Sequence, residues 1–161
     1  MATLTVVKFP TAGGADQMIG TLEGLQRERL ITIEDAAIVT WPSGKKGPKT
    51  RHLYSLAGVG VLHGSFWGLL FGLLFFVPFL GMAVGAATGA LMGSMAHVGI
   101  DDKFITEVQS KVVEGTSALF LLTSGAVINR LAVALQGQSF EVIATNLSRE
   151  NEEILRETFA A

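Results

Sequence analysis

Two histidines in a long uncharged segment are the side chains whose positions first suggest chemistry. His97 and Asp101 are four residues apart, so in a helix they would lie on one face and could bind a metal or relay a proton. A metal site needs three or more such groups with supporting partners, so this pair alone does not define one. We therefore interpret His97 as an interfacial side chain and Asp101 as a helix cap.

His63 lies inside the first part of the same segment. An ionisable group within an apolar helix is by default a candidate for function. It is also only about two helical turns from a basic cluster, which is equally consistent with an interfacial position. Both interpretations remain open.

No other pattern indicates a reaction. The chain has no cysteine, which excludes disulfides, thiolate metal sites and cysteine nucleophiles. No spacing of serine, histidine and acidic residues suggests a nucleophile with its base. The turns Gly13-Gly14 and Ser124-Gly125 precede predicted helices but lack the spacing of a P-loop or a dinucleotide fingerprint. We expect no catalytic residue, cofactor or metal, and therefore no enzyme.

The element that dominates the sequence is residues 54–100, which contain no Asp, Glu, Lys or Arg. Glycines recur in it at every fourth position, and in a helix such a run forms one smooth face. Pro78 separates two runs, and reversing the chain near residues 76–77 sets glycine against glycine. Small residues at this spacing let helices pack closely in lipid. We predict an antiparallel apolar helical hairpin with paired glycine zippers that mediates self-association. The zipper glycines are Gly60, Gly64, Gly68, Gly72, Gly81, Gly85, Gly89 and Gly93.

The two predicted arms, about residues 57–76 and 79–98, are each roughly 20 residues long, enough to cross a bilayer. The tip between them has no charged or strongly polar side chain where a spanning hairpin would meet water. A re-entrant hairpin, or one buried in a large assembly, would avoid that exposure. The three arrangements remain alternatives.

The segments on either side have the composition of a water-facing α+β domain. The order strand, glycine turn, helix, strand occurs at residues 3–41 and again at 117–145. Two such units form a split βαβ, or ferredoxin-like, antiparallel sheet with helices on one face. Residues 1–53 would be its first half plus a basic linker, with a short extended piece from residue 49. Residues 54–100 would be the inserted hairpin, and residues 101–161 a connecting helix, the second half and a C-terminal helix.

A cluster of basic residues immediately precedes the uncharged segment. We predict that it lies at a membrane interface and contacts anionic lipid. The same cluster favours the cytoplasm for both termini and places the protein in the inner membrane. A net charge of −2 gives no reason to expect nucleic acid as a partner. The predicted interface residues are Lys45, Lys46, Lys49, Arg51 and Tyr54.

Several short motifs resemble those of a widespread bacterial family of small glycine-zipper membrane proteins classed as a domain of unknown function. They are Ser65-Phe66-Trp67-Gly68, the tip at residues 76–81, the glycine run to Gly93, and residues 99–105. The resemblance covers nearly the whole chain. It implies a membrane protein without an assigned activity, so it assigns no functional residues.

The leading expectation for function is a self-associating membrane protein with a structural or interaction role, in membrane organisation or stress response. Its partners would be the lipid bilayer, further copies of itself, and an unidentified soluble partner of the ferredoxin-like domain. The alternative is a subunit of an oligomeric pore or transporter, for which the uncharged segment offers few polar lining residues.

Overall fold

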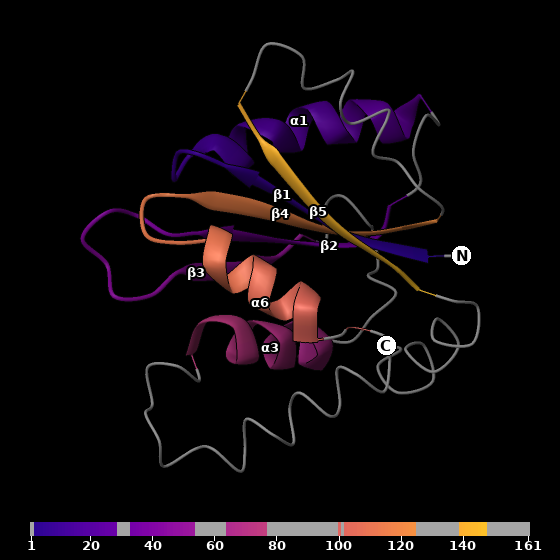
Figure 1. Cartoon of the computed structure of the whole chain (residues 1–161). Coiled ribbons are helices and arrows are strands. Elements are labelled where there is room, and N and C mark those ends of the chain that lie inside the picture. The colour runs from indigo at the N-terminus through magenta and orange to yellow at the C-terminus, as the bar shows by residue number, and fades with distance from the viewer. Residues whose placement is uncertain are drawn as a thin grey trace.

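The computed structural model describes residues 2–28, 33–53, 64–76, 100, 102–124 and 139–147. Within them, one antiparallel sheet lies between helices: α1 on one side, and α3 and α6 on the other (Figure 1). The elements in chain order are β1 (Ala2–Phe9), α1 (Gly14–Arg27), β2 (Ile33–Thr40), β3 (Lys49–His52), α3 (Gly64–Phe71), the π-helical turn η1 (Gly72–Phe76), α6 (Asp102–Lys111), β4 (Ser117–Ser124) and β5 (Glu141–Leu147).

The sheet has five strands in the order β3-β2-β4-β1-β5, and every neighbouring pair is antiparallel. β1 and β2, which α1 connects, lie on either side of β4. Val6 of β1 pairs with Phe120 of β4 and with Ile143 of β5. Alternate residues of β1 and β4 therefore point to opposite faces, and both faces are apolar.

The face covered by α1 has an ordinary amphipathic helix over it. Met18 and Leu22 are buried on one side of α1 against β1, β2 and β4, while Asp16 in the first turn and Arg27 in the last turn complement the helix dipole. Gly14 is required at the start of this helix, because a Cβ there would lie 2.6 Å from Cβ of Phe9. The chain thus turns tightly from β1 into α1.

The opposite face is covered by α6 and by the described part of the uncharged segment. Trp67, Phe71 and Phe75 follow one another at helical spacing and are at most 4% exposed. The rings of Trp67 and Phe71 contact Phe120 of β4 edge to face, with centroids 6.4 and 5.0 Å apart. Phe104 and Val108 of α6 belong to the same core.

This arrangement corrects the predicted fold class. In the described residues no inserted antiparallel hairpin is seen: residues 64–76 form a short α-helix and one π-helical turn that pack on the sheet. The sheet has a fifth strand at its edge, and the described helices cover both faces, not one. The absence of charge indicates burial but not what buries the segment, and here Phe120 and α6 take part in burying it.

The prediction of transmembrane helices is also wrong for the part of the chain that the structure describes. Its helices are all too short or too polar to cross a bilayer, and α3 has only eight residues. The second predicted arm, the tip proline Pro78 and the glycines from Gly81 to Gly93 lie outside the described residues.

Candidate functional site

The sheet carries a buried acid–base pair beneath α3. Asp35 of β2 alternates with Ala37 and Val39 onto the α3 face, where it is fully buried, whereas the register shift between Ile33 and Asp35 leaves Ile33 on the α1 face. His52 of β3 is on the same face, because it pairs with Ala37 of β2. Its Nε2 lies 2.5 Å from Oδ1 of Asp35, which also accepts the N–H of Ala36 at 2.9 Å. The ring of Trp67 lies above, 6.3 Å from that of His52.

A carboxylate that orients a histidine is a frequent part of catalytic and metal sites. In the described residues, however, no group of three or more His, Cys, Asp and Glu side chains could hold a metal. His52 is 11% exposed and packs beside Trp67, so the pair ties the edge strand β3 to β2 beneath α3. The Asp35–His52 pair therefore acts as a buried polar contact between two strands.

Sequence reasoning missed this pair, because Asp35 and His52 are 17 residues apart and belong to no short motif. The signal that could have found it is the turn at residues 42–48. A hairpin closed there pairs Ala37 with His52, and strand alternation then places Asp35, two residues before Ala37, on the same face as His52.

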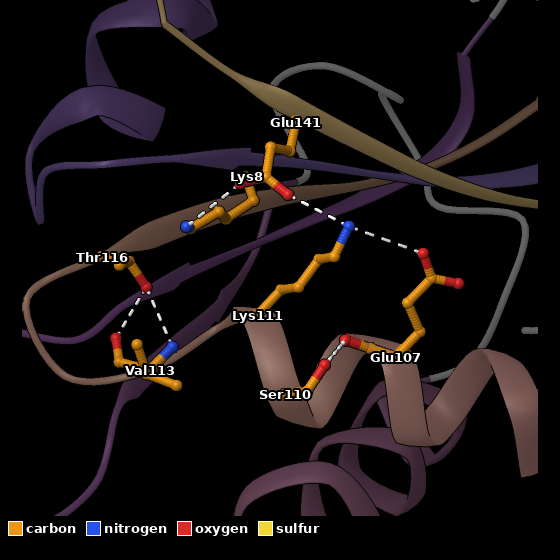
Figure 2. A network of polar contacts seen from close by, with 7 residues as sticks. All are labelled: Lys8, Glu107, Ser110, Lys111, Val113, Thr116 and Glu141. Carbon is orange, nitrogen blue, oxygen red and sulfur yellow. Dashed lines mark hydrogen bonds and ion pairs between the residues drawn. The ribbon is translucent and has the colours of Figure 1, made fainter.

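A second polar cluster is an ionic chain on the surface between α6 and the β1–β5 end of the sheet (Figure 2). Lys111 Nζ lies 3.1 Å from Glu141 Oε2 and 3.6 Å from Glu107 Oε1, and Lys8 Nζ lies 3.7 Å from Glu141 Oε1. The hydrogen bond and charge of Lys111 lower the pKa of Glu141, and the same contact raises the pKa of Lys111. The chain joins α6 to β5.

The Gly13-Gly14 turn at the start of α1, which lacks the spacing of a phosphate-binding loop, is hydrogen-bonded within the chain. The N–H of Ala15 donates to Ser117 Oγ at 2.9 Å, and that hydroxyl donates to the carbonyl of Thr11 at 2.7 Å. Gly13 supplies no side-chain cap. The Gly13-Gly14 turn is therefore an ordinary connection between a strand and a helix.

The predicted interface residues fall on the β2–β3 hairpin. The side chains of Lys45, Lys46 and Lys49 are exposed, and Arg51 forms an ion pair with Asp16 of α1 at 3.1 Å. Tyr54 lies outside the described residues. Their role at a membrane stays a prediction.

Of the predicted zipper glycines, three lie in the described residues. Gly64 begins α3, Gly68 is exposed on it, and Gly72 begins η1. Among the described residues, a Cβ on Gly68 or Gly72 would meet nothing within 4 Å. Gly60, His63 and His97 are not among the described positions, so the pairing of the two zippers stays a prediction.

The antiparallel sheet and the helices on its two faces define an α+β protein. The chain belongs to the family described as "Protein of unknown function (DUF1269)", which matches residues 61–160. Membership of a family of unknown function was expected from the motifs in the uncharged segment, and it is confirmed. No curated protein and no solved structure matches the chain.

Proposed function

We propose that the chain is a structural or interaction protein that associates with further copies of itself, rather than an enzyme. The observation that carries this proposal is the composition of α3. Its sequence, GSFWGLLF, has no charged residue on any side. A helix that is apolar all round is normally covered all round.

The sheet covers only one side of α3. Trp67, Leu70 and Phe71 are buried against it, whereas Gly68 is exposed and no atom of the described residues lies within 4 Å of its Cβ position. A bare, uncharged helix surface allows another helix backbone to approach closely. We assign that approach to a second copy of the chain.

The polar groups support a non-enzymatic role. Asp35 is occupied by His52 and by the N–H of Ala36, and Glu141 is shared between Lys111 and Lys8. Each carboxylate thus has a partner within the fold and links two of its elements. Carboxylates that are paired in this way stabilise the fold, which suits a protein with a structural role in an assembly.

The test is a single substitution with a matched control. Gly68→Leu places a bulky side chain on the proposed contact, and Gly20→Leu places the same side chain on α1. Gly20 is also an exposed helical glycine with nothing within 4 Å of its Cβ position. Both changes favour the helical state by about 1 kcal/mol, so neither is expected to unfold the chain.

We expect the full-length chain to form an oligomer in size-exclusion chromatography with light scattering. Gly68→Leu should shift it to the monomer mass, and Gly20→Leu should leave it unchanged. A wild-type monomer at all concentrations, or an unchanged oligomer in Gly68→Leu, would refute the proposal. The location at the inner membrane and the soluble partner stay predictions.

A further inference from the structure

The loop between β2 and β3, residues 42–48, carries two lysines in a fixed conformation; we call it the basic loop. The indole N–H of Trp41 donates to the carbonyl of Lys45 at 2.9 Å. The backbone of Trp41 exchanges two hydrogen bonds with residues 115 and 116, at 2.7 and 3.0 Å, and the N–H of Gly44 donates to the carboxylate of Glu114. The loop is therefore clamped to the turn that precedes β4.

Covalent geometry restricts the loop further. Pro42 and Pro48 bound it and fix their own φ angles. Gly44 and Gly115 both have φ of 85°, and a Cβ on Gly115 would lie 3.2 Å from Ser43 Oγ. A loop ordered before binding loses little conformational entropy when a ligand arrives.

The charges on this loop have no partners within the described part of the chain. Lys45, Lys46 and the adjacent Lys49 are exposed, and none forms an ion pair with a described carboxylate. Glu114, the acidic residue of the clamp, accepts the N–H of Gly44. By contrast, Lys8 and Lys111 each pair with Glu141.

An apolar side chain stands in the same clamp. Val113 is 42% exposed, the large hydrophobic side chain most open to solvent among the described residues. Thr116 Oγ1 holds its backbone by accepting the N–H of Val113 at 3.1 Å and donating to its carbonyl at 2.6 Å (Figure 2). Val113 thus lies in the turn to which the basic loop is hydrogen-bonded.

We propose that the basic loop, Lys49 and Val113 form a docking surface for the anionic phosphates of lipid headgroups. Clustered lysines with an exposed apolar side chain suit the boundary between headgroups and acyl chains. The loop extends beyond the end of the sheet (Figure 1), which suits contact with an extended surface. No spanning helix is needed, and the surface is separate from the Gly68 contact.

Nucleic acid and free polyphosphate fit these observations less well. Phosphate contacts alone would account for the lysines, but neither ligand offers an apolar region to Val113. The basic loop has no aromatic residue to stack on bases, and the adjacent Trp41 is half-buried, with its ring packed against Phe75 at 6.2 Å. Lipid vesicles, nucleic acid and polyphosphate are therefore expected to bind with different affinities, which can be compared at one salt concentration.

The assay is co-sedimentation of the full-length chain with vesicles of phosphatidylcholine, with or without phosphatidylglycerol. Wild type should bind the phosphatidylglycerol vesicles more tightly, and less so as salt rises. Lys45→Gln/Lys46→Gln/Lys49→Gln should lose the added affinity by about a hundredfold, at roughly fivefold per lysine. The control Arg27→Gln/Lys103→Gln removes two exposed cations elsewhere and should change binding by less than about fivefold, the effect of one lysine.

Two further variants test the geometry. Trp41→Phe keeps the lysines and the ring packing but removes the indole donor, and it should weaken binding less than the triple variant does. Val113→Ser should weaken binding equally at low and high salt, since its contribution is apolar. Thermal melts by circular dichroism establish that each variant is folded.

Undiminished binding of the folded triple variant to phosphatidylglycerol vesicles would overturn the proposal. So would equally tight binding of wild type to duplex DNA or tripolyphosphate at the same salt concentration. Neither result depends on oligomer formation, because the same assay is run on Gly68→Leu, which should bind the vesicles through an intact basic loop.

Discussion

The two faces of the sheet are closed by different kinds of helix. On one face α1 is amphipathic: Met18 and Leu22 are buried, and Asp16 and Gln17 are exposed. On the other face α6 is amphipathic in the same way, but α3 has no polar side to present to water. The comparison teaches that periodicity predicts how a helix packs only when the helix has two unlike sides.

The largest difference between the faces should appear on truncating Phe120. It is fully buried between Trp67 and Phe71, so Phe120→Ala removes the ring on which the α3 side is built. We expect a loss of about 4 kcal/mol in the free energy of unfolding. Leu119→Ala, the neighbouring residue on the α1 face, should cost about 3 kcal/mol. Urea titration measures both, and equal or reversed losses would contradict a core on the α3 side that is built on the Phe120 ring.

The acid–base link beneath α3 gives the next effect. His52→Ala leaves the buried carboxylate of Asp35 without its closest side-chain partner. We expect a loss of about 2 kcal/mol in the free energy of unfolding, with faster hydrogen exchange in β3. Arg51→Ala breaks an exposed ion pair on the same strand and should cost no more than about 0.5 kcal/mol. If the two variants are equally stable, the pair does not hold β3.

Two glycines of α1, Gly14 and Gly20, differ in how closely other atoms pack around them. Gly14→Ala should cost about 2 kcal/mol, because its Cβ would press on the backbone-proximal Cβ of Phe9 at 2.6 Å. Gly20→Ala has nothing within 4 Å and should stabilise the chain by about 1 kcal/mol. Thermal unfolding of both variants tests this prediction. If both variants lose stability, or both gain it, the packing described around Gly14 and Gly20 is contradicted.

The smallest effect is the pH dependence of the ionic chain on α6. Because the folded pKa of Glu141 is lowered, its contribution is present above the unfolded value of about 4.3 and is lost as pH falls through the folded pKa. Because the folded pKa of Lys111 is raised, its contribution is present below about 10.4 and is lost as pH rises through the folded pKa. Lys111→Met should move the NMR titration of Glu141 upward; an unmoved titration would exclude the contact.

Much of the sheet could be predicted from the sequence, because strands and amphipathic helices leave regular patterns. The alternation at residues 3–9, the run at 117–123 and the apolar stripe from Phe104 to Val112 all correspond to observed elements. The covering of the second face was predicted wrongly. A segment without charge can be buried either in a bilayer or in a protein core. The described part of this segment packs on the ring of Phe120, which lies in a distant strand.

The candidate sites, too, could be predicted from the sequence only in part. The basic cluster was visible as composition, but its clamp by Trp41 and Glu114 depends on a loop 70 residues further along. The Asp35–His52 pair was missed because its two residues lie in different strands, 17 positions apart, and form no short motif.

The position of β1 in the sheet has a consequence for synthesis. Both of its neighbours, β4 and β5, are made late, and even the contact between Ala15 and Ser117 spans 102 residues. On the ribosome the first strand emerges without either partner, and the uncharged segment emerges before the Phe120 ring that it packs on. Closing such distant pairings is slow. Until β4 and β5 have been made, such a nascent chain has no partner strands with which to cover the apolar faces of β1.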